Sequence, residues 1–134
     1  MTPRALAVIL ASADLQKLYT GLSLLVCAAA EGRSARGLVT FGALGVLVDD
    51  ELERRALQPH GTPQLTREGR RIFARSLAEL RDTVADLEHC RLEACSAAVQ
   101  TTGVAPGDVA RRLDGVTSTP RFLREVAGAE LVVV

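Results

Sequence analysis

The feature that most constrains this fold is a repeated alternation of short apolar runs with longer helix-forming segments. The first run, ALAVILA at residues 5–11, is continuously apolar, which is typical of a strand covered on both faces of a parallel sheet. Residues 15–31 then have the length and composition of a helix, with Ser12 and Asp14 available as N-caps and Gly32 as its end. Because parallel strands need a crossover between them, a chain that begins this way is expected to form an α/β sheet.

The alternation continues to the end of the sequence. Further strands are expected at residues 36–41, 90–95, 114–118 and 129–134. Helical segments are expected at residues 42–48, 49–57, 96–103, 106–113 and 120–128, with a longer helix beginning at Thr66 after a proline-rich loop at residues 58–64. The inward stripe of that longer helix is predicted to be Ile72, Phe73, Leu77, Leu80, Val84 and Leu87. Right-handed crossovers then predict one domain over residues 1–134, a three-layer α/β/α sandwich with a mainly parallel five-stranded sheet.

The helix at residues 15–31 is apolar around almost its whole circumference. A helix with so little polar surface is expected to be buried on two sides. The sheet covers one side, so the other predicts a subunit interface with contributions from Tyr19, Leu22 or Val26. The chain is therefore expected to form a homo-oligomer.

The charge balance and the aromatic content argue against nucleic acid as a partner. Lys plus Arg number 16 and Asp plus Glu number 16, aromatic residues make up 3% and Trp is absent, so neither a global positive field nor stacking surfaces are available. A local basic cluster does exist, and it is interpreted as a solvated helix face, with an anion or partner contact as the alternative. Its members are Arg67, Arg70, Arg71 and Arg75.

Cytoplasmic localisation is expected, with no membrane partner. No apolar run approaches the ~20 residues that a bilayer-spanning helix needs. Residues 1–13 imitate a short signal peptide, but their apolar part fits a buried first strand equally well, and that interpretation is favoured. The three cysteines form an odd count with no disulfide framework, and the spacing of His89, Cys90 and Cys95 matches no zinc site.

The predicted topology gathers polar and small residues at one edge of the sheet. Ligands of parallel α/β sheets bind outside the carboxyl ends of the strands. Lys17, one turn into its helix, would lie near that edge as a pocket cation, with an ordinary surface lysine as the alternative. The other residues expected there are Ser12, Asp14, Phe41, Gly42, Cys95, Ser96, Thr117 and Ser118.

Cys95 is the candidate reactive residue. It is predicted to end a strand and precede a helix, whose first N–H groups and dipole favour a thiolate. The alternative is a small buried residue that only packs. Cys27 and Cys90 are expected in apolar core positions that raise a thiol pKa. Glycine motifs for dinucleotide or nucleoside triphosphate binding are absent, and no cofactor is expected.

Four segments together resemble the DsrE/DsrF-like family, which includes peroxiredoxin-like members. They are ILASADLQKLYTGLSLLVCAAAEG, GLVTFGALGVL, LEACSAAVQTTGV and GVTSTPRFLREVAGAELVVV, and they span nearly the whole chain. The resemblance implies a Rossmann-like domain that forms homo-oligomers, often trimers or hexamers. In the sulfur-relay branch, a cysteine at the position of Cys95 carries persulfide sulfur. The hypothesis is therefore a sulfur carrier or sulfurtransferase that exchanges sulfur through Cys95 with a donor or acceptor protein. The alternative is a non-catalytic oligomer that binds a small ligand or a protein partner.

Overall fold

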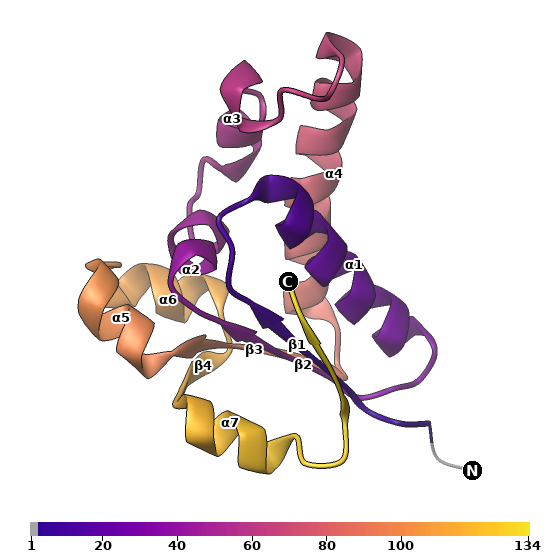
Figure 1. Ribbon diagram of the computed structural model, residues 1–134, viewed down its shortest axis with the longest axis vertical. Helices are drawn as coiled ribbons and strands as arrows, with labels where there is room; N and C mark the ends of the chain where they lie inside the picture. The colour runs from indigo at the N-terminus through magenta and orange to yellow at the C-terminus, as the bar shows by residue number, and fades with distance from the viewer. Residues whose placement is uncertain (1–2) are drawn as a thin grey trace.

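The computed structural model describes residues 3–134, and it contains a five-stranded sheet in which every neighbouring pair is parallel. The first two residues of the predicted domain and of the leader-like segment lie outside the described residues. The sheet order is β4-β3-β2-β1-β5, and helices cover both faces, which confirms the predicted three-layer Rossmann-like class (Figure 1). The strands are β1 Leu6–Leu10, β2 Ala35–Val39, β3 Cys90–Cys95, β4 Gly115–Thr117 and β5 Glu130–Val133.

The helices follow the predicted alternation, with small shifts at their ends. They are α1 Leu15–Ala30, α2 Gly42–Leu47, α3 Leu52–Ala56, α4 Arg67–Asp86, α5 Ser96–Thr102, α6 Pro106–Arg112 and α7 Thr119–Glu125. A 3-10 turn, Pro59–Gly61, lies inside the predicted proline-rich loop. Among residues 3–134, no helix is both long and apolar enough to cross a bilayer.

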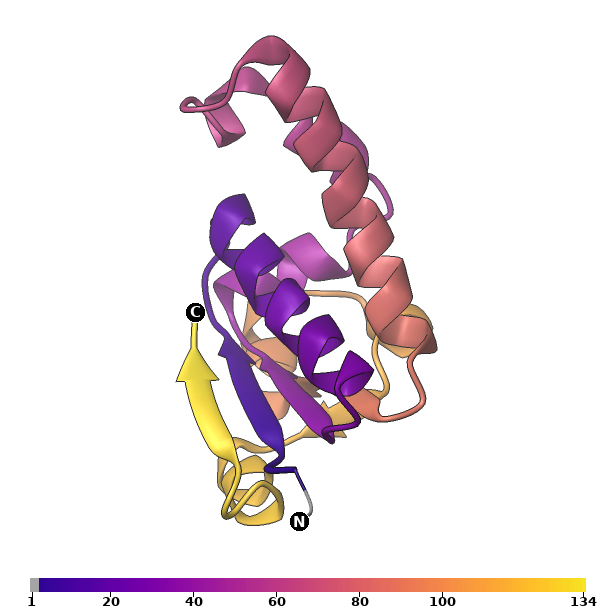
Figure 2. The same cartoon turned by 90° about the vertical axis from the view of Figure 1, so that its right-hand side faces the viewer.

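The two faces of the sheet are covered unequally. Helices α1 and α4 pack on one face, where a Cβ atom at Gly37 would lie 3.3 Å from Cδ1 of Leu25 in α1. Helix α7 lies on the opposite face, where Glu125 pairs with Arg36 of β2 (Figures 1 and 2). The connection from β4 to β5 crosses the sheet in the reverse direction to the others, so a right-handed crossover places α7 on that face.

Helix α1 is covered by the sheet and by α4, which changes two predictions. Leu22 is fully buried inside the protein, so its predicted part in a subunit interface is wrong. Tyr19 packs against Phe73 of α4 with ring centroids 5.3 Å apart, and Val26 is half-buried. Cys27 is exposed, so its predicted core position is also wrong, because it lies on the outward side of α1 whereas Leu25 and Ala28 face the core.

The inward stripe of α4 is confirmed at Leu77 and Val84 but is wrong at Ile72, which is 60% exposed. The amino-terminal part of α4 extends with α3 beyond the sheet, so helical periodicity continues where there is no core to face (Figure 1).

Arg81 is buried on α4. Its guanidinium donates hydrogen bonds to the carbonyl oxygens of Leu47 and Asp49 at 3.2 and 2.6 Å, which satisfies the end of α2.

Candidate functional site

Cys95 is the last residue of β3 and lies directly before α5, as predicted. Its register partner is Thr117, the last residue of β4. The chain leaving β3 runs to α6, where Arg112 pairs with Asp82 of α4 at 3.4 Å, whereas the chain leaving β4 runs to α7 on the opposite face. In α/β sheets, ligands bind at the carboxyl edge where neighbouring connections diverge in this way.

Hydrogen-bond donors surround the Cys95 thiol. Burial favours the neutral thiol and is the largest single influence, but it is outweighed by four donors. These are the backbone N–H groups of Ala98 and Ala97 and the hydroxyl groups of Thr40 and Thr119, with the Thr119 Oγ1 atom 3.8 Å from Sγ. Together they hold the pKa of Cys95 below its ordinary value, so the site stabilises the thiolate more than water does.

Thr40 was missed by sequence reasoning because strand β2 was expected to run to Phe41. The strand ends at Val39, so Thr40 lies at the carboxyl edge instead of inside the strand. Phe41 has a φ of 35°, a conformation that a bulky residue rarely adopts and that turns the chain out of the sheet. The signal that could have located Thr40 is Gly42, since glycine marks places where backbone segments approach closely. A Cβ atom at Gly42 would lie 3.1 Å from the backbone nitrogen of Ala13.

The three thiols lie in different environments. Cys95 is 3% exposed, so the residues over its sulfur must move before a reagent reaches it. Cys90 is buried at the opposite end of β3, and burial, with a smaller contribution from the charge of Asp114, raises its pKa to about 11. Cys27 is exposed on α1. Cys95 therefore combines burial with stabilisation of the anion, which a packing residue does not require.

Three of the predicted site residues line a separate pocket beside β5. The pocket has a volume of about 850 Å³ and is lined by Ser12, Asp14 and Lys17 together with Val133 and Val134. The Ser12 hydroxyl accepts a hydrogen bond from the backbone N–H of Asp14, and the Asp14 carboxylate caps α1 by accepting one from the backbone N–H of Lys17. Two of the three polar groups thus already serve the turn into the helix.

The remaining predicted residues lie nearer to Cys95. Phe41 follows Thr40 directly, and its side chain is 52% exposed. Gly42 begins α2 against the loop after β1, and Ser96 is the first residue of α5. The predicted edge therefore divides into two parts, with Cys95 on the β3–β4 side and Lys17 on the β1–β5 side.

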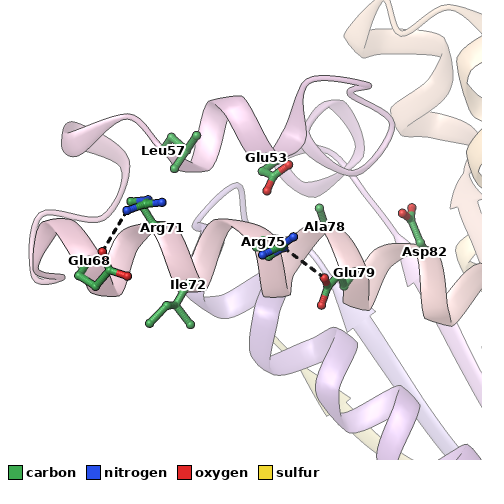
Figure 3. Close-up of a pocket in the computed structure, with 9 residues that line it drawn as sticks. All are labelled: Glu53, Leu57, Glu68, Arg71, Ile72, Arg75, Ala78, Glu79 and Asp82. Carbon is green, nitrogen blue, oxygen red and sulfur yellow. Dashed lines mark hydrogen bonds and ion pairs between the residues drawn. The ribbon is translucent and has the colours of Figure 1, made fainter.

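A shallow groove of about 480 Å³ lies on α3 and α4, on elements other than those that carry Cys95 (Figure 3). Two members of the predicted basic cluster line it, and each is paired with an acid on its own helix: Arg71 with Glu68 at 3.2 Å and Arg75 with Glu79 at 3.6 Å. Arg70 instead bonds to the Thr62 hydroxyl and to backbone carbonyls. These pairings fit a solvated helix face better than an anion site.

Within residues 3–134, no three His, Cys, Asp or Glu side chains are grouped so that they could hold a metal ion. Comparison with known protein families finds none that matches this chain. Comparison with curated proteins also finds no match.

Proposed function

We propose that this protein is a cytoplasmic, homo-oligomeric sulfur carrier of the DsrE-like type that accepts and relays sulfane sulfur through Cys95. The observation that carries the proposal is the place of Cys95 at the carboxyl edge of the sheet, with its Sγ atom 3.8 Å from the Thr119 hydroxyl and with the Thr40 hydroxyl and two backbone amides lowering its pKa. A thiol that only filled space would need none of them, because cysteine is readily buried as a small hydrophobe. The free state of all three cysteines fits a reducing compartment such as the cytoplasm.

The proposed reaction exchanges one sulfur–sulfur bond for another. The Cys95 thiolate attacks the outer sulfur of a donor persulfide, R–S–SH. A bond forms between Cys95 Sγ and that sulfur, the donor's S–S bond breaks, and the donor leaves as the thiolate R–S⁻. The proton stays on the transferred sulfur, so the product is Cys95–S–SH and nothing is oxidised or reduced overall. An acceptor thiolate removes the sulfur by the same step.

The surroundings of Cys95 support both halves of this exchange. The donors that stabilise the attacking thiolate also stabilise the same anion when it departs after sulfur is handed on. Phe41, exposed directly after Thr40, offers an apolar contact for the partner that brings or takes the sulfur. The burial of Cys95 would slow the attack of dilute competing thiols on its persulfide until that partner docks.

Loading with a small inorganic polysulfide, followed by mass spectrometry of intact protein and peptides, tests the proposal. The expected result is one added sulfur on the peptide that contains Cys95, and loss of that addition in Cys95→Ser. Cys27→Ser and Cys90→Ala are matched controls, because one removes an exposed thiol and the other a buried thiol with a raised pKa. Loading that persists in Cys95→Ser would contradict the proposal.

A non-catalytic ligand-binding oligomer is the second candidate. It is favoured by the 850 Å³ pocket, whose lining includes Lys17, Gln16 and Thr20 but not Cys95. Under this function Cys95 is packing, and Cys95→Ala leaves ligand binding unchanged whereas Lys17→Ala weakens it. A thermal-shift screen of small organic anions, carried out on both variants, separates the two functions.

A further inference from the structure

Among residues 3–134, nothing pairs with the outer edge of β5. In this part of the chain, strand β5 ends the sheet and pairs only with β1, and Figure 2 shows no helix or strand outside it. The backbone N–H groups of Glu130 and Val134 donate inward, each at 2.9 Å, to Ala5 and Ile9. Because alternate residues of a strand direct their backbone groups to opposite edges, Leu131 and Val133 present their N–H and C=O groups outward.

The same two residues carry exposed apolar side chains. Leu131 is 48% exposed and Val133 is 63% exposed, and both lie on the α7 face, in register with Ala7 and Ile9. Proteins usually protect an edge strand with proline, lysine or a bulge. Strand β5 has none of these, and its one charged residue, Glu130, already pairs with Arg33 of its own chain at 2.8 Å. The opposite edge of the sheet, β4, is only three residues long.

We propose that β5 pairs with β5 of a second copy of this chain, antiparallel about a twofold axis at Val132, to form one continuous sheet. In this register Leu131 of each copy lies opposite Val133 of the other. Residues 131 and 133 are those with outward backbone groups, so each Leu131–Val133 pair exchanges two hydrogen bonds and all the outward groups of both residues are satisfied. Their exposed side chains become cross-strand neighbours on one face.

Charge complementarity on the other face favours the same partner. A Cβ atom at Gly21 of α1 would lie 2.8 Å from a side-chain atom of Val134, so the even-numbered residues of this segment, Glu130 among them, face α1. Lys17 lines the pocket at Val133 and Val134, and it makes no ion pair within residues 3–134. The twofold register brings Glu130 of the second copy opposite Val134. The Glu130 carboxylate remains 53% exposed beside Arg33 of its own chain, so in this register its free side faces the Lys17 side of the other copy.

This inference rests on the proposed function in one respect only, because both require the chain to self-associate. The interface at β5 replaces the one predicted on α1, where Leu22 is buried. Its tests use no sulfur chemistry. A chain that pairs through β5 but takes no sulfur on Cys95 overturns the proposed function and supports the inference. A chain that loads sulfur on Cys95 but does not pair through β5 overturns the inference and supports the proposed function.

Cross-linking tests the register. In a Cys27→Ser background, which removes the exposed thiol, Val132→Cys places two cysteines directly opposite each other at the axis, in a non-hydrogen-bonded pair with Cα atoms about 4.5 Å apart. Mild oxidation is expected to give a covalent dimer. The matched control Val133→Cys lies opposite Leu131, so its two copies are beyond the ~7 Å that a disulfide can span. Equal cross-linking of both variants, or none in Val132→Cys, would overturn the register.

Sedimentation tests the edge itself. The wild-type chain is expected to form a dimer, or a larger even-numbered assembly that contains this dimer, at micromolar concentration. Val133→Lys should weaken the twofold contact by at least about tenfold, and Lys17→Glu should weaken it less. Ile72→Lys, which charges an equally exposed apolar residue on α4, should have no effect. A wild-type monomer, a trimer, open-ended aggregation, or a Val133→Lys variant that assembles normally would each contradict the proposal.

Discussion

The Sγ atom of Cys95 lies 3.8 Å from Oγ1 of Thr119, so the residue that ends β3 contacts the residue that begins α7. Removing this hydroxyl in Thr119→Val leaves a residue of similar shape but takes away one of the four donors. The pKa of Cys95 should therefore rise, and its alkylation at neutral pH should slow several-fold. Thr119→Ser keeps the hydroxyl and should behave as the wild type. Equal slowing in the serine variant would show that packing, not the hydrogen bond, matters.

The pH dependence of alkylation gives a second prediction. In the folded protein the reaction of Cys95 should reach half its maximal rate at a lower pH than in the denatured protein, because the fold lowers the pKa of this thiol. A small iodoacetamide reagent with peptide mapping measures the profile for each cysteine. We further expect Cys95 to react before Cys90, since both thiols are buried and the fold lowers the pKa of the first and raises that of the second. A folded-state profile at or above that of the denatured chain would remove the basis for thiolate chemistry.

The raised pKa of Cys90 predicts that the folded protein loses stability in alkaline solution. Burial raises its pKa from the ordinary 9.0 to about 11, so the fold favours the protonated thiol. That contribution is fully present below pH 9 and is lost as the pH rises toward 11. Its full size is roughly 2–3 kcal/mol in the free energy of unfolding. Urea denaturation of wild type and Cys90→Ala at several pH values isolates the effect, since the variant should show a shallower decline.

An ion-pair cluster beneath α7 gives a prediction about folding stability. The Arg36 guanidinium lies 2.6 Å from Glu93 and 2.8 Å from Glu125 of α7. The Glu93 side chain is 7% exposed, so Glu93→Gln would leave a poorly hydrated arginine without its closest counter-charge and should cost about 3 kcal/mol. Glu125→Gln, at a more exposed site, should cost much less. Chemical denaturation with both variants tests this ranking, and equal losses would contradict it.

Several parts of this structure follow from local sequence. Strand β3 was predicted at residues 90–95 because an apolar run ends where small, helix-compatible residues begin, and the structure has the same bounds. Ser12 and Asp14 are the caps that the sequence offers for α1, and the Asp14 side chain accepts a hydrogen bond from a helix N–H group. Position at the carboxyl edge of a parallel sheet then followed from topology.

The predictions that were wrong concern residues whose burial or backbone conformation depends on tertiary contacts. The periodicity of α4 identified Ile72 as inward, but it could not reveal that the core ends before this residue. Cys27 looked buried because its neighbours in sequence are apolar, although it lies on the outward side of α1. Thr40 was missed because the positive φ of Phe41 shortens β2 and cannot be inferred from the residues LVTF.

The central claim is tested most directly by a chain that retains Cys95 as its only cysteine, made by combining Cys27→Ser with Cys90→Ala. After exposure to a small persulfide donor, intact-mass spectrometry should show one added sulfur per chain. Addition of a small acceptor thiol should then discharge that sulfur and restore the original mass. A folded chain that gains no sulfur, or that gains sulfur it cannot pass on, would contradict the assignment of Cys95 as a sulfur carrier.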